Sequence, residues 1–169
     1  MKTTIGSKNY LHPMPVVIVG ASVDGKPNYA PVTHVGILDF NTVSLSLGKA
    51  HFTNQGIVEN GTFSVNIPSV DMVELTDYFG LVSGRDVDKS EFVEAFYGEL
   101  KTAPMIQVCP INMECRLVQT LDLPHHKVFI GEIVQTYCEQ ACFTCLLYTS
   151  DAADEEDSVD LGGGGIIKK

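Results

Sequence analysis

Residues 43–68, VSLSLGKAHFTNQGIVENGTFSVNIP, have the pattern of a strand, a turn, a short helix and a second strand. Apolar residues alternate with serines over residues 43–47 and with polar residues over residues 62–67, which is the period of a half-buried strand. Between the two strands the sequence predicts a helix over residues 54–60, with Thr53 as its N-cap residue. This segment decides the fold, because both strands bury one face and the helix between them has to fit the same core.

Polar residues at alternate positions stand just before the predicted helix: Lys49, His51 and Thr53. The first N–H groups of a helix lack intrahelical partners, so a helix start with a cation and a hydroxyl beside it is suited to phosphate. Taken alone, such a polar trio is more often solvated surface. The adjoining helix start favours an anion site, and with it a bound phosphorylated cofactor.

The N-terminal part of the chain predicts two more strands. Residues 15–23 are apolar and β-branched, and an Asp-Gly turn at residues 24–25 leads from this buried strand to the next. The second strand is predicted over residues 28–38. Pro31 lacks an N–H group, so this strand requires an edge, a bulge or a ligand at that point. Together with the strand at residues 43–48, these segments predict an antiparallel meander.

The rest of the chain predicts a helix, a loop and two long strands. The helix lies within residues 69–82, and a loop over residues 86–104 contains a helical turn near residues 91–95. The strands cover residues 111–121 and 126–137. Six or so antiparallel strands with two short helices predict a mainly β protein, a small closed or split barrel. No G-x-G-x-x-G motif follows a strand, which disfavours a βαβ nucleotide fold.

Composition excludes several kinds of partner. The 169-residue chain has a formal net charge of −10, which argues against nucleic acid and anionic membranes. The sequence has neither a membrane-length apolar run nor a signal peptide, so a cytoplasmic location is expected. Five cysteines, an odd number, give no framework of secreted disulfides. The adjacent His125 and His126 point to opposite faces of a strand, and we expect no metal site.

Residues 143–169 differ in character from the rest of the chain. They contain an acidic run, four consecutive glycines and two lysines, without the periodicity of a core element. This composition predicts a disordered tail. The string LLYTSDAADE also resembles the translated read-through of a sequencing adapter, so the tail is interpreted as disordered or non-native. We therefore expect one domain over residues 1–142.

Five motifs together resemble one known family. They are, in chain order, NYAPVTHVG, SLSLGKAHFTNQGIVENGTFSVNIPS, SGRDVDKSEF, PINMECRLVQ and LPHHKVFIGEI. Over about residues 13–137 they resemble the flavin reductase-like, FMN-binding split-barrel family, and within it the flavoredoxin branch. The resemblance implies a six-stranded antiparallel Greek-key split β-barrel with short flanking helices. It also implies a homodimer that holds FMN noncovalently near the subunit interface.

The resemblance implies a phosphate site at the predicted helix start. Thr53 would bind the phosphate of FMN, with Lys49 and His51 beside it. The backbone of Asn54 would contribute a further donor, and Lys89 would reach the flavin or its phosphate.

The flavin ring, by the same resemblance, lies along the second strand. Asn28 would contact the flavin, and backbone N–H groups around Pro31 and Thr33 would bond to its ring. His34 would flank the ring, at a position where relatives often carry an aromatic residue such as tryptophan. His126 matches the histidine near which the nicotinamide stacks, so it is the candidate catalytic residue.

Two functions agree with this resemblance. The first is an NAD(P)H-dependent FMN reductase, an NAD(P)H:FMN oxidoreductase that transfers hydride to bound FMN. The second is an FMN-binding electron-transfer protein, flavoredoxin-like, which a redox protein partner reduces and which has no nicotinamide site. Relatives continue beyond the strand at residues 126–137, so the domain over residues 1–142 is expected to be incomplete at its C-terminal end.

Overall fold

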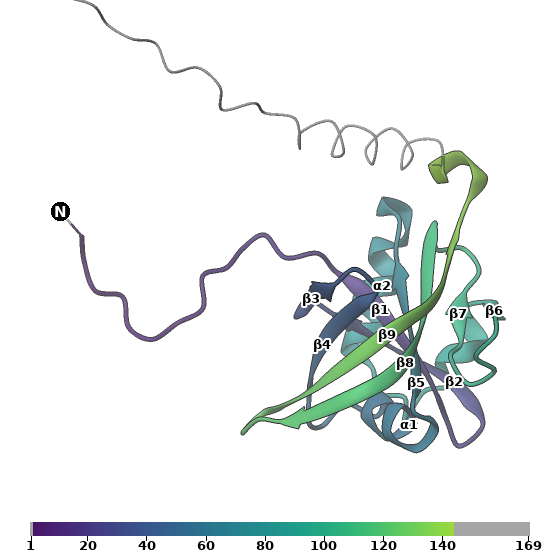
Figure 1. Ribbon diagram of the computed structural model, residues 1–169, viewed down its shortest axis with the longest axis horizontal. Coiled ribbons are helices and arrows are strands. Elements are labelled where there is room, and N and C mark those ends of the chain that lie inside the picture. Colours follow the sequence, from purple (N-terminus) through teal and green to yellow (C-terminus); the bar gives the residue numbers. More distant parts are fainter. Residues whose placement is uncertain (1, 144–169) are drawn as a thin grey trace, which may run out of the picture. The chain divides into compact units, whose positions relative to one another are not determined.

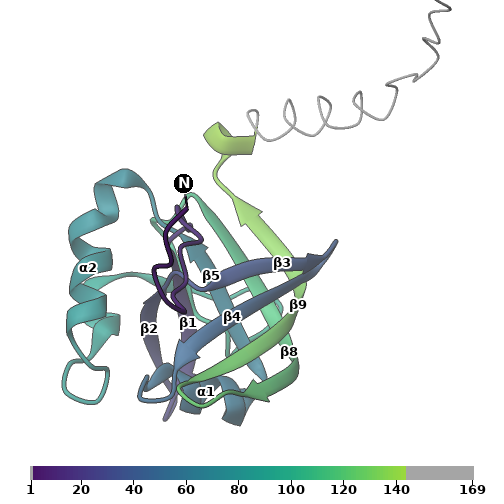
Figure 2. The ribbon, with the colours of Figure 1, turned by 90° about the vertical axis from the view of Figure 1, so that its left-hand side faces the viewer.

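Seven strands form one sheet in the computed structural model, which describes residues 2–143 (Figure 1). The strands are β1 (Val17–Val23), β2 (Lys26–Val32), β3 (Val35–Asp39), β4 (Thr42–Gly48), β5 (Thr62–Ile67), β8 (Ile111–Asp122) and β9 (His126–Cys138). Their order across the sheet is β2-β1-β5-β8-β9-β4-β3. Strands distant in sequence pair antiparallel, β1 with β5 and β4 with β9. Figure 2 shows the sheet curled round on itself, so the predicted mainly β split barrel is confirmed.

One predicted strand, over residues 28–38, is in fact two. The chain leaves the sheet at Thr33 and His34, which link β2 to β3, and these two strands stand at opposite ends of the strand order. Because β2 pairs with β1 and β3 pairs with β4, the expected meander is wrong. A curled sheet brings its two ends together, so a single segment passes from one to the other. The break raises the strand count to seven, and Pro31 lies on β2, an end strand of the order.

The helix α1 (Thr53–Asn60) lies at one end of the barrel, as Figures 1 and 2 show. Gly56 permits its close approach to β1, because a Cβ at this position would lie 2.2 Å from the carbonyl oxygen of Ser22. Gly61 ends the helix in the left-handed conformation and donates its N–H to the carbonyl oxygen of Ile57. The predicted helix is therefore confirmed, and it begins one residue earlier than expected.

A second layer lies outside the barrel. Its elements are η1 (Val70–Met72), α2 (Val73–Leu81), η2 (Lys89–Phe92), β6 (Ala95–Phe96) and β7 (Met105–Ile106). Helices α2 and η2 lie against β2, and β7 lies against β5 and β8 (Figure 2 shows α2 beside β2). The helix predicted within residues 69–82 is confirmed. The helical turn expected near residues 91–95 lies at residues 89–92.

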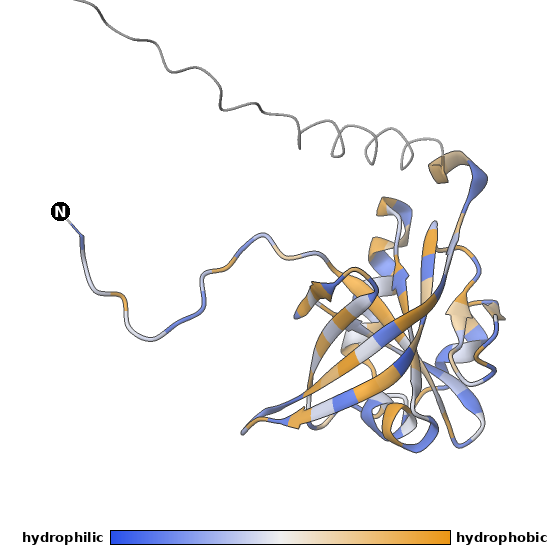
Figure 3. Cartoon of the chain, in the orientation of Figure 1, coloured by the Kyte–Doolittle hydropathy of each residue, from blue (hydrophilic) through white to orange (hydrophobic). Residues whose placement is uncertain are grey.

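Two apolar clusters hold these layers together. The first fills the barrel and includes Val19, Leu45, Phe63 and Phe129. The second lies between the sheet and the outer layer and consists of Ile18, Tyr29, Met72, Phe79, Ile106 and Cys109. Successive residues of β1 face the two clusters in turn, which explains why the whole strand is buried. Along residues 111–117 of β8 apolar and polar residues alternate (Figure 3), but the polar Asn112 and Glu114 are buried as well, so this part of the strand is covered on both faces.

A buried carboxylate, Glu114 on β8, fastens the segment after β6 to the barrel. Glu114 is fully buried and accepts hydrogen bonds from the N–H groups of Glu99, at 3.0 Å, and Leu100, at 2.7 Å. It also accepts one from the Tyr137 hydroxyl on β9, at 2.7 Å. This single side chain therefore ties two strands and a loop together.

Residues 144–169 lie outside the described residues, and with them nearly all of the tail predicted at residues 143–169. Among residues 2–143, no helix is long and apolar enough to cross a membrane. In the same part of the chain, no three His, Cys, Asp or Glu side chains gather in a way that suits a metal ion.

We predict that Glu114→Ala lowers the free energy of unfolding by about 2–4 kcal/mol, because it leaves buried donors without their acceptor. Urea denaturation followed by circular dichroism measures the change. The matched control is Glu132→Ala, which removes an exposed ion pair with Arg116 and should cost less than about 1 kcal/mol. Equal losses in the two variants would contradict the role given to Glu114.

Candidate functional site

A cavity of about 220 Å³, the helix-start cavity, opens where α1 begins. Residues 50–53 form one wall, and residues 79–84, at the end of α2 and just after it, form another. Asn28 and Ala30 on β2 and Lys89 on η2 complete the lining. The cavity thus lies where the edge of the barrel, the first helix and the outer layer meet.

Two backbone donors at the start of α1 are free. The N–H of Asn54 donates to the carbonyl oxygen of His51 at 3.2 Å, and that of Gln55 donates to Phe52 at 3.1 Å. The N–H groups of Phe52 and Thr53 have no partner within residues 2–143. Free N–H groups at a helix start attract anions, and the helix dipole adds to the effect. The free donors are therefore Phe52 and Thr53, whereas the backbone of Asn54, expected to serve the phosphate, is occupied.

The Thr53 side chain is not the N-cap that its sequence position predicted. Thr53 is the first residue of the helix, and the residue at the cap position, Phe52, makes no side-chain cap bond. Instead, the buried Thr53 hydroxyl oxygen accepts a hydrogen bond from Asn28 Nδ2 at 2.8 Å. The hydroxyl keeps its own proton for a ligand. Gly84 lies directly against this pair, since a Cβ there would be 1.8 Å from Asn28 Oδ1.

Lys89 brings a buried positive charge to the cavity wall. Only 4% of the residue is exposed, and its Nζ donates to the carbonyl oxygens of Tyr29, at 2.8 Å, and Phe79, at 2.7 Å. No carboxylate among the described residues pairs with it. Burial lowers the pKa of Lys89 to about 8. Because an ammonium group has three donors, one N–H remains for an anion.

One histidine, His51, lies near this charge, and two more lie beyond it. His34, in the β2–β3 link, and His126, at the start of β9, have ring centroids 5.5 Å apart in an edge-to-face arrangement. His51 lines the helix-start cavity. Desolvation, together with the positive charges of Lys89 and His126, lowers the pKa of His51. His51 is therefore close enough to Lys89 and His126 to interact with them electrostatically.

Several predicted site residues do not line the helix-start cavity: Pro31, Thr33, His34, Lys49, Asn54 and His126. Lys49 forms an ion pair with Asp122 at 3.0 Å, because the β8–β9 hairpin brings that carboxylate beside it. Pro31 lines a separate cavity between β2 and the outer helices, together with Gly80. Thr33 is exposed in the β2–β3 link, next to His34. The expected contribution of Lys49 to a phosphate site is thus replaced by an ion pair on the surface.

Phe52 lines the helix-start cavity and Arg85 packs against it, although sequence reasoning missed both. The Arg85 guanidinium carbon lies 5.0 Å from the centroid of the Phe52 ring, and its Nη1 donates to the Ala50 carbonyl oxygen at 3.1 Å. Arg85 therefore ties the loop after α2 to the residues before α1. The motif SGRDVDKSEF contains Arg85 next to a glycine, and this could have pointed to the arginine. The sequence analysis gave a role only to Lys89 in that motif.

The chemistry of this donor set fits a phosphate group. Two free N–H groups, the Thr53 hydroxyl and the Lys89 ammonium converge on the cavity, and none of its lining residues is acidic. Several donors and no competing carboxylate are what a phosphate requires. The arrangement is thus suited to hold and orient a phosphorylated ligand.

Comparisons with known proteins agree with the fold. The family model described as Flavin reductase like domain matches residues 9–155. The chain is 48% identical to flavoredoxin from Methanosarcina acetivorans, whose crystal structure superposes with a TM-score of 0.81 over 83% of this chain and 76% of that one. Flavoredoxin of Desulfovibrio vulgaris (Miyazaki F) is 31% identical, with a TM-score of 0.76 over 84% of this chain and 79% of that one.

A third relative is an uncharacterized protein of Archaeoglobus fulgidus. It is 30% identical over 129 residues, which cover 74% of this chain and 72% of that protein. The family match spans most of the chain, and the fold agrees with it. The protein therefore belongs to the family described as Flavin reductase like domain.

Proposed function

We propose that this protein binds FMN and transfers hydride to it from NAD(P)H. The observation that supports FMN most directly is the buried Lys89 ammonium beside the free N–H groups of Phe52 and Thr53. A buried cation without a carboxylate partner costs free energy unless an anion compensates it. The phosphate of FMN is such an anion, and the two similar flavoredoxins support a flavin as the ligand.

The flavin ring, in this proposal, lies along the β2–β3 link. The N–H groups of Thr33 and His34 have no partner among residues 2–143, so they can donate to the polar edge of the ring. Strand β2 ends before the link and β3 begins after it, so these N–H groups are not used in hydrogen bonds between paired strands. Asn28, which lines the helix-start cavity and is hydrogen-bonded to Thr53, can contact the part of FMN next to the phosphate.

The residues of the chain contribute binding and orientation. When bound, FMN supplies a ring that accepts hydride from a nicotinamide. Lys89 and the start of α1 fix the phosphate end. His126, held edge-on against His34, offers a surface beside the link where a nicotinamide can stack. Transfer between stacked rings depends on near-contact distance and alignment, so no acid or base of the protein is required.

The second candidate function is electron transfer. Two similar solved structures, 48% and 31% identical to this chain, are both named flavoredoxin. On this alternative the same FMN site serves a redox protein partner, and the surface beside His126 receives no nicotinamide. The two functions share the phosphate site and differ only in what approaches the ring.

We further propose that the protein acts as a homodimer in the cytoplasm. The β3–β4 hairpin exposes large apolar side chains: 86% of Ile37 and all of Phe40 are exposed. Contiguous apolar surface of this kind marks a protein interface. Sedimentation of the protein with and without FMN tests the assembly, and a monomer under both conditions would contradict it.

We predict that Lys89→Met weakens FMN binding by about tenfold to a hundredfold, the effect of removing a hydrogen bond to a charged group. Quenching of FMN fluorescence measures the dissociation constant. The matched control is Lys49→Met, which removes a surface lysine paired with Asp122 and should change affinity less than about threefold. Equal effects of the two substitutions would contradict the proposed phosphate site.

A second prediction concerns pH. The pKa of Lys89 is about 8, so its ammonium is present below that pH and is lost as the pH rises through it. FMN affinity should therefore fall as the pH increases above 8, while the phosphate itself stays dianionic. The same fluorescence titration across pH measures the effect. In Lys89→Met this loss should disappear, and a loss that persists would assign the pH dependence to another group.

A third prediction separates the two candidate functions. If the protein is a reductase, anaerobic mixing of its FMN complex with NADH or NADPH removes the visible absorbance of the flavin. His126→Ala should slow this reaction by about tenfold or more through misplaced rings, and it should leave FMN affinity unchanged. His125→Ala, at the neighbouring position, is the control. An absorbance that neither nicotinamide removes would overturn the reductase and leave the electron-transfer protein.

A further inference from the structure

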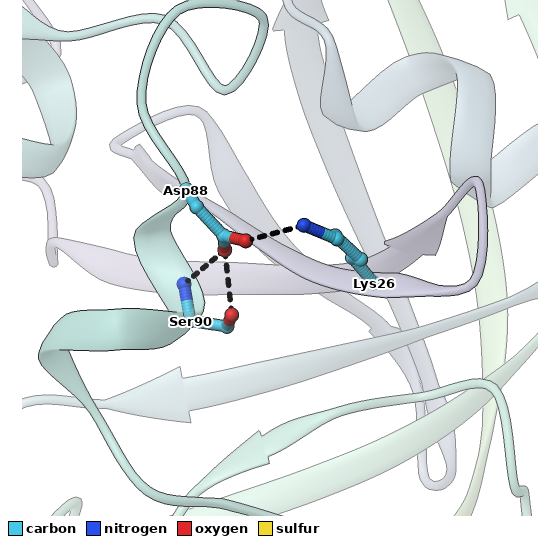
Figure 4. A network of polar contacts seen from close by, with 3 residues as sticks. All are labelled: Lys26, Asp88 and Ser90. Carbon is cyan, nitrogen blue, oxygen red and sulfur yellow. Dashed lines mark hydrogen bonds and ion pairs between the residues drawn. The ribbon is translucent and has the colours of Figure 1, made fainter.

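One cluster of charged side chains outside the proposed site is complete in itself. Figure 4 shows Asp88 between Lys26 and Ser90. Lys26 Nζ lies 2.8 Å from Asp88 Oδ2, and the other carboxylate oxygen accepts hydrogen bonds from the N–H and hydroxyl groups of Ser90. Donation by Lys26, together with the bonds from Ser90, lowers the pKa of Asp88 to about 2. A carboxylate with these partners needs no ligand.

Two thiols at the end of β9 form a pair of a different kind. Cys138 is the last residue of β9, and Cys142 lies in a helical stretch over residues 140–143. Cys138 Sγ donates to the carbonyl oxygen of Glu139 at 3.3 Å, and the N–H of Cys142 donates to the same oxygen at 2.9 Å. The turn therefore brings both cysteines to one carbonyl group. Both are free thiols and partly exposed.

The surroundings of this thiol pair favour a cation. Residues 138–143, CEQACF, contain a glutamate and no lysine, arginine or histidine. Partial burial, together with the nearby Cys142 and Glu139, raises the pKa of Cys138. Cysteines that act as nucleophiles stand beside positive groups, which lower their pKa. The pair is therefore poorly suited to attack a disulfide, whereas a metal ion can displace the thiol protons and be bound by both sulfur atoms.

The number and type of the ligands narrow the choice of metal. Thiolates are soft ligands, and in proteins they bind Zn²⁺, iron–sulfur clusters and Cu⁺. Zinc sites use three or four protein ligands, and iron–sulfur clusters are typically held by four cysteines. Among residues 2–143, no three His, Cys, Asp or Glu side chains gather for such a site. Two thiolates suit Cu⁺, a soft ion that two sulfur atoms can bind.

We propose that Cys138 and Cys142 bind one Cu⁺ ion through their two sulfur atoms. Each thiol gives its proton to solvent, and two Cu–S bonds form with no change in the oxidation state of the metal or of sulfur. Because protons compete with the metal for the sulfur atoms, affinity should rise with pH. The site uses none of the residues given to the flavin, so it is independent of the proposed function.

The test is anaerobic competition for Cu⁺ between the reduced, full-length protein and bicinchoninate, whose Cu⁺ complex is coloured. The parent protein should take up one ion per chain. Cys138→Ser and Cys142→Ser should each lower the affinity by about a hundredfold or more, since even a residue that only orients a metal ligand is worth about tenfold to a hundredfold. The matched control is Cys145→Ser, outside the described residues, which should leave the affinity unchanged.

Alkylation gives a second readout. Cu⁺ should protect Cys138 and Cys142 from iodoacetamide, and mass spectrometry of the digested protein locates the protected thiols. The proposal is overturned if the parent takes up no Cu⁺, if both serine variants match the parent, or if Cys145→Ser loses as much affinity as Cys142→Ser. It also fails if oxidised glutathione joins the pair in a disulfide while Cu⁺ leaves both thiols open to alkylation, because the pair is then a redox site.

Discussion

The ammonium group of Lys89 is the interaction on which the arrangement of the site depends. It donates hydrogen bonds to two carbonyl oxygens from different elements, one on the edge strand β2 and one in the last turn of α2. The carbonyl end of a helix carries partial negative charge, which stabilises the buried cation in part. The remaining charge faces the helix-start cavity. The contact that fixes α2 against β2 therefore also brings a positive charge to the wall of the cavity.

Much of the fold was predictable, because it depends on local patterns. The alternation around Leu45 and Phe63 and the turn at Asp24 gave strands and a hairpin that the structure confirms. The break at Thr33 and His34 was not predictable from the same evidence. Residues on both sides of it are β-formers, and only the curling of the whole sheet decides that the chain changes edges there.

In the candidate site, too, features set by local sequence were predictable, and features set by contacts between distant segments were not. Sequence placed an anion site at the start of α1, since helix starts always leave free donors. It could not show that Asn54 is occupied, that Lys49 meets Asp122, or that Lys89 is buried, because each depends on a partner distant in sequence. Arg85 was missed for this reason as well: its role comes from its stacking on Phe52, a contact between separate elements.

The bond between Tyr137 and Glu114 also sets where the barrel can be shortened. Tyr137 is the last residue of β9 that a side-chain hydrogen bond ties to the interior of the sheet, among the described residues. A fusion partner or affinity tag joined just after this strand would leave the bond in place. Removal of Tyr137 itself would release one anchor of the Glu99–Leu100 loop and open that side of the molecule to proteases.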